Sequence, residues 1–350
     1  MTDTAQPVPR HLARYARQIQ FPGIGLDGQE KLHAARVLIV GCGALGSVIA
    51  ETLTRAGIGR LRLADRDFVE LNNLQRQVLY DEHDVARRLP KAVAAAEKLK
   101  AINSAVHFET EVIDVNWRNI ERLVEGVDVI LDGTDNFETR FLINDISLRH
   151  SIPWIYGGCL GATGQTLTIV PPHTPCLRCL YPEPPPAGAG ETCDTAGITA
   201  SIILTIAAVQ SLEAIKILAE RHDAVSPYLQ VFDLWENRCR QIGLQNLAPF
   251  ENCPCHQGEH PWADGRRAAQ DAVLCGRNAV QLRFPNATAV SLDELESKWR
   301  PLGNVIRNPF LVRLETDGHQ ITVFADGRAI VEGTQDPAQA KTLYARFVGN

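Results

Sequence analysis

The stretch at residues 36–65, RVLIVGCGALGSVIAETLTRAGIGRLRLAD, decides the fold of this chain. It starts with apolar residues 37–40, passes through a glycine-rich turn into a helical pattern, and ends with a second apolar run that stops at Asp65. This order of strand, turn, helix and strand is typical of a nucleotide-binding unit in an α/β protein. An acid at the end of the second strand suits a ribose hydroxyl of the nucleotide.

The glycines of the turn, Gly41, Gly43 and Gly46, would let backbone N–H groups and a helix N-terminus approach phosphate. Alone, this pattern is a weak signal. It becomes specific after the acid, because Asn73 and Arg76 add an amide and a guanidinium near the expected phosphates. Hydride transfer builds no charge on phosphate, so a dehydrogenase needs no cation here, whereas an enzyme that breaks a triphosphate does. We therefore predict an enzyme that uses ATP.

Apolar runs alternate with helical patterns through the first half of the chain. This alternation predicts a doubly wound α/β fold with a mostly parallel sheet and a Rossmann-like nucleotide site. The strands are expected at residues 37–40, 61–64, 106–111, 127–131 and 154–156, and the helices at 45–56, 91–102, 117–124 and 137–149. A hairpin-like pair is expected around residues 162–170.

The residue composition and pattern of the sequence change after residue 260. Residues 1–260 are predicted to form an ATP-binding adenylating domain with a zinc site, and the polar residues 261–271 a linker. Residues 272–350 are predicted to form a small α+β domain of unknown role. Its strands are expected at 279–284, 310–314, 321–324 and 329–331, and its helices at 292–299 and 338–348.

Composition limits the function and the compartment. The 350 residues carry a net charge of −6, from 35 Lys and Arg against 41 Asp and Glu, which argues against nucleic-acid binding through a basic surface. The start of the chain has no apolar signal core. Polar residues interrupt the longest apolar stretch, 198–219, which predicts a buried helix rather than a membrane span. We expect a cytoplasmic protein, in which nine cysteines serve as thiols, metal ligands or catalytic groups.

Attack of a carboxylate on the α-phosphate of ATP needs charge neutralisation, a held metal and a positioned pyrophosphate. Arg76 and Lys91 follow the ribose acid and are predicted to face the phosphates from one side of the sheet. Asp135 follows a predicted strand and so lies at the carboxyl edge of the sheet, where open α/β proteins bind ligands. Because Mg²⁺ prefers carboxylates and phosphate oxygens, Asp135 is the candidate metal ligand.

Two clusters of cysteines predict a structural zinc site. Cys176 and Cys179 have the two-residue spacing of a zinc knuckle, and Cys253 begins the second cluster, Cys-Pro-Cys-His. The fourth ligand is either Cys255, through a tight Cys-x-Cys pair, or His256, on which the two-residue spacing falls. A filled tetrahedron leaves no open position for chemistry.

Cys193 ends a Pro/Gly/Ala-rich loop just before the long apolar stretch. A thiol at a helix N-terminus has its thiolate favoured by the helix dipole, which makes Cys193 a candidate nucleophile. The competing interpretation is an inert thiol beside the helix cap. Cys275 opens the small domain and is more simply explained as core filling.

Together these motifs make the chain resemble the MoeB/ThiF/HesA family, whose members activate ubiquitin-like sulfur-carrier proteins and are related to the ubiquitin-activating enzymes. The resemblance covers about residues 10–257. It rests on the glycine turn, the Cys-x-x-Cys pair and five further motifs, namely Arg14-Tyr15-x-Arg17-Gln18-Ile19, Gly28-Gln29-x-x-Leu32, Asn73-Leu74-Gln75-Arg76-Gln77, Thr134-Asp135-Asn136-x-x-x-Arg140 and Glu213-Ala214-x-Lys216.

The resemblance implies ATP-dependent adenylation of a carrier protein's C-terminal glycine carboxylate, at the end of a Gly-Gly tail. It implies that Asp65 and the glycine turn hold the nucleotide and that Asn73, Arg76 and Lys91 hold its phosphates. It also implies that Arg17 reaches in from the other subunit of a homodimer. In some members a loop cysteine that matches Cys193 takes the carrier or its sulfur.

Two other functions remain open from the sequence. One is ATP-dependent activation of a small-molecule or tRNA-attached carboxylate, which the cysteine pairs and the Cys193 loop argue against. The other is a non-catalytic scaffold in which the nucleotide is structural and the small domain binds a partner.

Overall fold

The computed structural model describes residues 8–185, 196–244, 252–267, 271–274, 278–282, 290–316, 318–325 and 327–349. The chain divides into two compact units, Met1–Arg267 and Ala268–Asn350.

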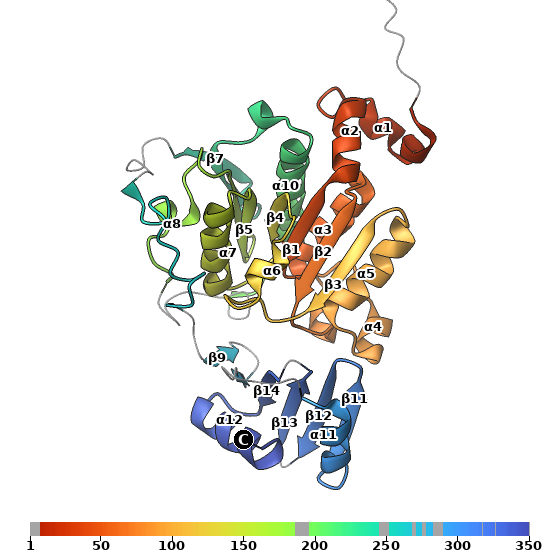
Figure 1. Cartoon of the computed structure of the whole chain (residues 1–350), viewed down its shortest axis with the longest axis vertical. Helices are drawn as coiled ribbons and strands as arrows, with labels where there is room; N and C mark the ends of the chain where they lie inside the picture. Colours follow the sequence, from red (N-terminus) through yellow and green to blue (C-terminus); the bar gives the residue numbers. More distant parts are fainter. Residues whose placement is uncertain are drawn as a thin grey trace, which may run out of the picture. The chain divides into compact units, whose positions relative to one another are not determined.

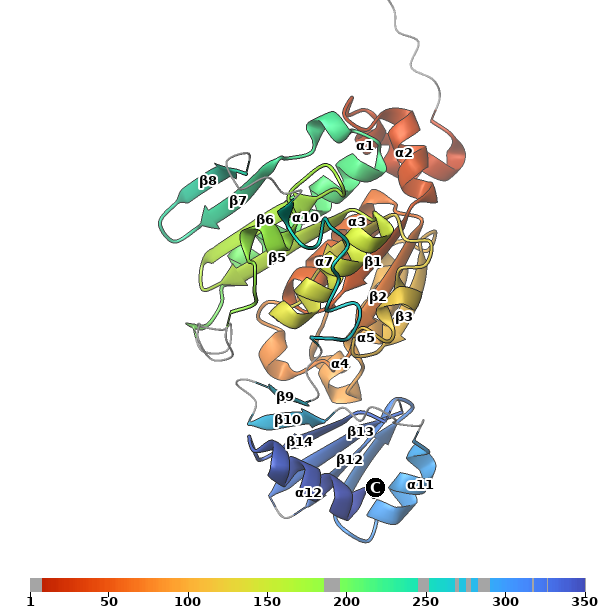
Figure 2. The same ribbon diagram turned by 60° about the vertical axis from the view of Figure 1, so that its left-hand side comes forward.

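An eight-stranded sheet forms the centre of the first unit, in the order β3-β2-β1-β4-β5-β6-β7-β8 (Figures 1 and 2). The five strands from β3 to β5 are parallel to one another, and the last three continue the sheet antiparallel. This confirms the predicted doubly wound, mostly parallel α/β fold. The strands are β1 (Arg36–Val40), β2 (Arg60–Asp65), β3 (His107–Val112), β4 (Val129–Asp132), β5 (Trp154–Leu160), β6 (Thr163–Ile169), β7 (Tyr228–Asp233) and β8 (Arg238–Gly243).

Helices cover both faces of this sheet, as the apolar strands require. In β1, Val37 and Ile39 belong to one core cluster, and Leu38 and Val40 to the cluster on the other face. The first face carries α3 (Ala44–Ala56), α5 (Lys91–Ile102) and α10 (Ala200–Leu218), and the second carries α6 (Ile120–Leu123) and α7 (Phe137–His150). Shorter or peripheral helices are η1 (Arg10–Tyr15), α1 (Ala16–Ile19), α2 (Gly25–Ala34), η2 (Leu71–Asn73), α4 (Glu82–Arg87), α8 (Leu177–Leu180) and η3 (His222–Ala224).

The N-terminal helices pack at the amino edge of the sheet. The Gln18 side chain donates to the carbonyl of Ala56, the last residue of α3, and Arg14 donates to that of Ile102, the last residue of α5. α3 and α5 run antiparallel to the parallel strands, so the last residues of both helices lie at the edge of the sheet opposite the glycine turn.

Within the part of the chain that is described, α10 is the one helix long and apolar enough to cross a membrane by length and composition. Of that apolar window, 61% is buried inside the protein, and α10 packs against α3 and β5. It has the surroundings of a core helix.

The second unit contains a six-stranded sheet in the order β11-β12-β13-β14-β10-β9, with every neighbouring pair antiparallel. Its core packs Trp299 and Phe347 from two helices against apolar residues of the strands. The elements are β9 (Asp271–Leu274), β10 (Ala279–Leu282), α11 (Leu292–Trp299), β11 (Asn304–Asn308), β12 (Leu311–Thr316), β13 (His319–Phe324), β14 (Ala329–Glu332) and α12 (Pro337–Phe347).

The structure corrects the predicted linker at 261–271. Residues up to Arg267 belong to the first unit. Trp262 is buried there against the ring of Phe141, and its backbone N–H donates to Asp145. Residues 261–267 are thus held to α7 by the Trp262 ring and by the buried Asp145 carboxylate.

Candidate functional site

The glycine turn between β1 and α3 is packed too tightly for any side chain at two of its positions. A Cβ on Gly46 would lie 1.8 Å from the carbonyl oxygen of Gly41, which itself has φ +88°. The loop after β4 closes on the same turn, because a Cβ on Gly133 would lie 2.3 Å from that oxygen. The residue that precedes α3, Gly43, has no side chain to cap the helix. The first backbone N–H groups of α3 therefore face the turn without a side-chain partner from the cap residue.

Asp65 ends β2 beside this turn. Its carboxylate accepts hydrogen bonds from the backbone N–H groups of Cys42 and Asp67, each at 2.6 Å. Burial raises the pKa of Asp65, while the positive charge of Lys91 acts in the opposite direction. The carboxylate is thereby fixed at the carboxyl end of β2, where a ribose would lie in this class of fold.

Lys91, the first residue of α5, is brought next to the glycine turn. Its buried ammonium lies 3.3 Å from a carboxylate oxygen of Asp67. The hydroxyl of Tyr80 lies 2.6 Å from the carbonyl of Cys42 in the turn and 3.2 Å from the carbonyl of Lys91. Sequence reasoning missed Tyr80, whose role depends on two carbonyls that only the fold brings together.

Asn73 and Arg76 lie on and just after η2. Asn73 is buried, and its side-chain oxygen accepts from the backbone N–H of Glu70 at 3.2 Å, which closes the first turn of η2. The Arg76 guanidinium donates to the carbonyl of Asn72 at 2.9 Å and is half-buried. Arg76 therefore has a side chain that can turn toward a ligand at little cost.

Asp135 lies on the exposed loop between β4 and α7. Among the described residues, no hydrogen bond or ion pair engages its carboxylate, so its oxygens remain available to a cation. Arg66, which the sequence analysis did not single out, lies in the same region. Burial tends to lower the pKa of Arg66, but the carboxylates of Asp114, Asp67 and Asp135 outweigh it and raise that pKa.

The two cysteine clusters meet in space although they are far apart in sequence. The sulfur of Cys176 lies 3.7 Å from that of Cys179 and 3.8 Å from that of Cys253. Donor atoms lie within 4.8 Å of one another in two overlapping sets, Cys176 with Cys253 and Cys255, and Cys176 with Cys179 and His256. Such a group of soft donors fits zinc.

The choice between Cys255 and His256 involves a further set of contacts. Cys255 is buried, and its sulfur lies 3.2 Å from the guanidinium of Arg178 and 3.4 Å from the side-chain amide of Asn144. The N–H donors favour a thiolate, whereas the Asp145 carboxylate, with an oxygen 3.5 Å from the same sulfur, opposes it. Each candidate belongs to one donor set, Cys255 with Cys176 and Cys253, and His256 with Cys176 and Cys179.

One residue predicted for the nucleotide site, Arg17, lies away from the glycine turn. Arg17 is exposed on α1, at the amino edge of the sheet, and donates to Gln20 at 3.2 Å. It therefore lies at the edge opposite the site of its own chain. Cys193 and Cys275 lie outside the residues that the structure describes.

The chain is similar to several known proteins. The profile of the ThiF family matches residues 15–255. The chain is 43% identical over 338 residues to the sulfur carrier protein ThiS adenylyltransferase of Bacillus subtilis (strain 168), covering 96% of this chain and 99% of that protein. It is also 38% identical over 235 residues to the adenylyltransferase and sulfurtransferase MOCS3 of Xenopus laevis. That match includes 67% of this chain and 51% of the MOCS3 protein.

Among solved structures, E. coli MccB has a similar fold, with a TM-score of 0.59 and 23% identity over 70% of this chain and 72% of MccB. At that identity, the likeness concerns the fold alone.

Proposed function

The chain belongs to the ThiF family, and from this premise we propose that it is an ATP-dependent adenylyltransferase that activates the C-terminal glycine carboxylate of a ubiquitin-like sulfur-carrier protein. The observation that supports the proposal most directly is the packing of Gly133 against the glycine turn, because the loop that carries Asp135 starts at this contact. The near full-length similarity to a ThiS adenylyltransferase supports a ThiS-like carrier of thiamine biosynthesis, or a related molybdopterin carrier.

The residues suit an attack by the carrier's carboxylate oxygen on the α-phosphorus of ATP. A new oxygen–phosphorus bond forms, the bond to the β-phosphate bridge breaks, and pyrophosphate leaves with its negative charge. The α3 N-terminus and Lys91 would hold the phosphates, and Arg76 would balance the charge that develops on the leaving group. Mg²⁺ held by Asp135 would neutralise phosphate oxygens. Asp65 would orient the ribose.

Exchange of radiolabelled pyrophosphate into ATP tests this proposal, because the exchange requires a reversible adenylate. We expect exchange only when a carrier ending in Gly-Gly is present, and none with the same carrier lacking its last glycine. Exchange without any protein partner would favour activation of a small-molecule carboxylate. Nucleotide that binds but never exchanges would favour a scaffold.

We further propose that the active form is a homodimer in which Arg17 completes the partner's site. The position of Arg17 at the amino edge, opposite its own glycine turn, supports a role in trans. Mixing the inactive variants Arg17→Ala and Asp135→Ala after mild dissociation should then restore activity, to about a quarter of the parent's, because half the dimers regain one of two sites. Absence of recovery in mixtures shown to contain the mixed dimer would contradict this role.

Cys193 is proposed as the nucleophile of a later step. Its thiolate would attack the carbonyl of the acyl-adenylate, releasing AMP and forming a thioester. Cys193→Ser should leave pyrophosphate exchange at the parent's rate and abolish the thiol-sensitive adduct with the carrier, as seen by mass spectrometry. Cys239→Ser, which removes an exposed cysteine, serves as the matched control. Formation of the same adduct by Cys193→Ser would exclude this assignment.

The two cysteine clusters are proposed to hold one structural zinc, as their soft donors allow. We place the protein in the cytoplasm, without stable membrane insertion, where free thiols persist. Its net charge of −6 gives no support to nucleic acid as a partner.

A further inference from the structure

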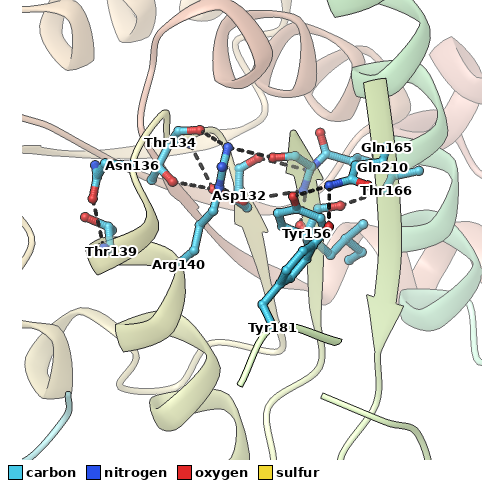
Figure 3. A network of polar contacts seen from close by, with 12 residues as sticks. Asp132, Thr134, Asn136, Thr139, Arg140, Tyr156, Gln165, Thr166, Tyr181 and Gln210 are labelled. Carbon is cyan, nitrogen blue, oxygen red and sulfur yellow. Dashed lines mark hydrogen bonds and ion pairs between the residues drawn. The ribbon is translucent and has the colours of Figure 1, made fainter. Parts of the chain in front are cut away.

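The loop at residues 133–136 is fixed around Asp135 on both sides. Thr134 donates to the Asp132 carboxylate through its backbone N–H at 2.9 Å and through its hydroxyl at 2.7 Å. Asn136 caps α7 by accepting from the backbone N–H of Thr139 at 2.9 Å (Figure 3). The neighbours of Asp135 are thus anchored to the fold, and Asp135 is left with an exposed carboxylate.

Arg140 joins this loop to the rest of the sheet. From one turn inside α7, its Nε donates to Asp132 at 3.1 Å, and one terminal nitrogen donates to the carbonyls of Thr134 at 2.7 Å and Gly157 at 3.0 Å. In Figure 3 its guanidinium lies beside Asp132 and Thr134. A single buried side chain therefore ties the loop to the end of β4 and to the middle of β5.

Arg140 is not placed to bind ATP itself. Its guanidinium is buried between the rings of Phe137 and Tyr156, with its central carbon 5.5 Å and 5.3 Å from their centroids. Burial lowers the pKa of Arg140, but Asp132 and the other anionic neighbours, Asp135 among them, outweigh this effect and raise it. The side chain stays charged and attracts the Asp135 carboxylate, although only 8% of it is exposed.

The opposite side of the loop is fixed by the glycine turn, through the close approach of Gly133 to Gly41 and Gly46. The loop is therefore held by glycine packing on one side and, on the other, by the hydrogen bonds of Thr134 and Asn136 and by Arg140, which also reaches β5.

We propose that Arg140 is the positioning residue for Asp135, setting the loop so that this carboxylate meets the divalent cation of ATP bound at the glycine turn. That the bound nucleotide is ATP rests on the proposed function. It predicts a specific effect on metal affinity, since residues that orient a metal ligand typically change that affinity by about 10–100-fold when replaced.

The test measures Mn²⁺ binding to the full chain saturated with α,β-methylene-ATP, by the electron paramagnetic resonance signal of free Mn²⁺. Arg140→Gln alone would leave Asp132 buried and unpaired, so it is combined with Asp132→Asn. We expect this double variant to bind Mn²⁺ roughly tenfold more weakly or worse than both the parent and Asp132→Asn alone, and to bind the metal-free nucleotide as the parent does. Arg149→Gln removes an arginine of the same helix that pairs with Glu121 and Asp264, and should match the parent.

Arg140→Lys is the second variant if the double variant does not fold. Lysine keeps the charge beside Asp132 but cannot bridge both carbonyls, so Mn²⁺ affinity should again fall. Parental Mn²⁺ affinity in a folded variant, or an equal loss of metal-free nucleotide binding, would overturn the proposal. The assay needs no carrier protein, so its outcome is separate from that of pyrophosphate exchange, on which the proposed function depends.

Discussion

Replacing Arg76 with alanine should slow carrier-dependent pyrophosphate exchange by about 10²–10³-fold, the usual cost of removing one charge-stabilising donor from a transition state. The structure indicates that this loss would be catalytic rather than conformational. The guanidinium is half-buried and donates to the neighbouring carbonyl of Asn72, a local contact on which little of the fold depends. Asp135→Ala should cause a comparable loss, because it removes the proposed ligand of Mg²⁺. This loss would also be catalytic rather than conformational, since the exposed carboxylate makes no other contact in the described part of the chain.

Arg55→Ala is the control for the Arg76 variant. Arg55 forms an exposed ion pair with Glu51 along α3, far from the glycine turn, and its loss should change exchange very little. The measurement is exchange rate against ATP concentration, with thermal unfolding to verify the fold. Parental exchange in both Arg76→Ala and Asp135→Ala would defeat the assignment of the phosphate site.

Loss of zinc should have the second large effect, on stability. Cys176 is shared by both sets of donors, so Cys176→Ser disrupts the site whichever residue is the fourth ligand. Free energies of structural zinc binding in zinc-finger peptides are about 10–16 kcal/mol, and even a fraction of this equals the whole stability of a typical domain. We expect Cys176→Ser to purify without zinc, to unfold at a much lower temperature, and to resemble the parent treated with a chelator.

The same measurement can identify the fourth ligand. If Cys255 is a ligand, Cys255→Ser loses zinc while His256→Asn retains it, and the reverse result assigns His256. Cys239→Ser should keep both zinc and the parental unfolding temperature. A parent protein that contains no zinc, and whose unfolding is unaffected by chelator, would contradict a metal site here.

The parts of the fold that depend on local pattern could be predicted from sequence. The first two strands and α3 follow from the apolar runs and the glycine turn, and α5 begins and ends where the sequence indicated. By contrast, β8 was missed, because its exposed residues Arg238–Gly243 show no apolar alternation. The helix expected at 117–124 shrinks to the four residues of α6.

Much of the candidate site depends on tertiary contacts that no spacing reveals. The residues proposed for the phosphate site could be named from the sequence, because a charge or an amide after a strand has a recognisable place in an open sheet. The supporting contacts were not. Tyr80 bridges carbonyls of residues 42 and 91, and Arg140 reaches the carbonyl of Gly157 on a different strand. The meeting of Cys176 with Cys253 was predictable only because zinc requires four ligands.

A crystal structure with Mg²⁺ and α,β-methylene-ATP tests the central claim most directly. The account predicts the triphosphate above the glycine turn, the Asp135 carboxylate on the metal, and the Arg76 guanidinium and the Lys91 ammonium on phosphate oxygens, with the ammonium drawn away from Asp67. A nucleotide bound at this turn with the side chains of residues 76 and 135 directed away from it would contradict the enzymatic account and leave only the fold.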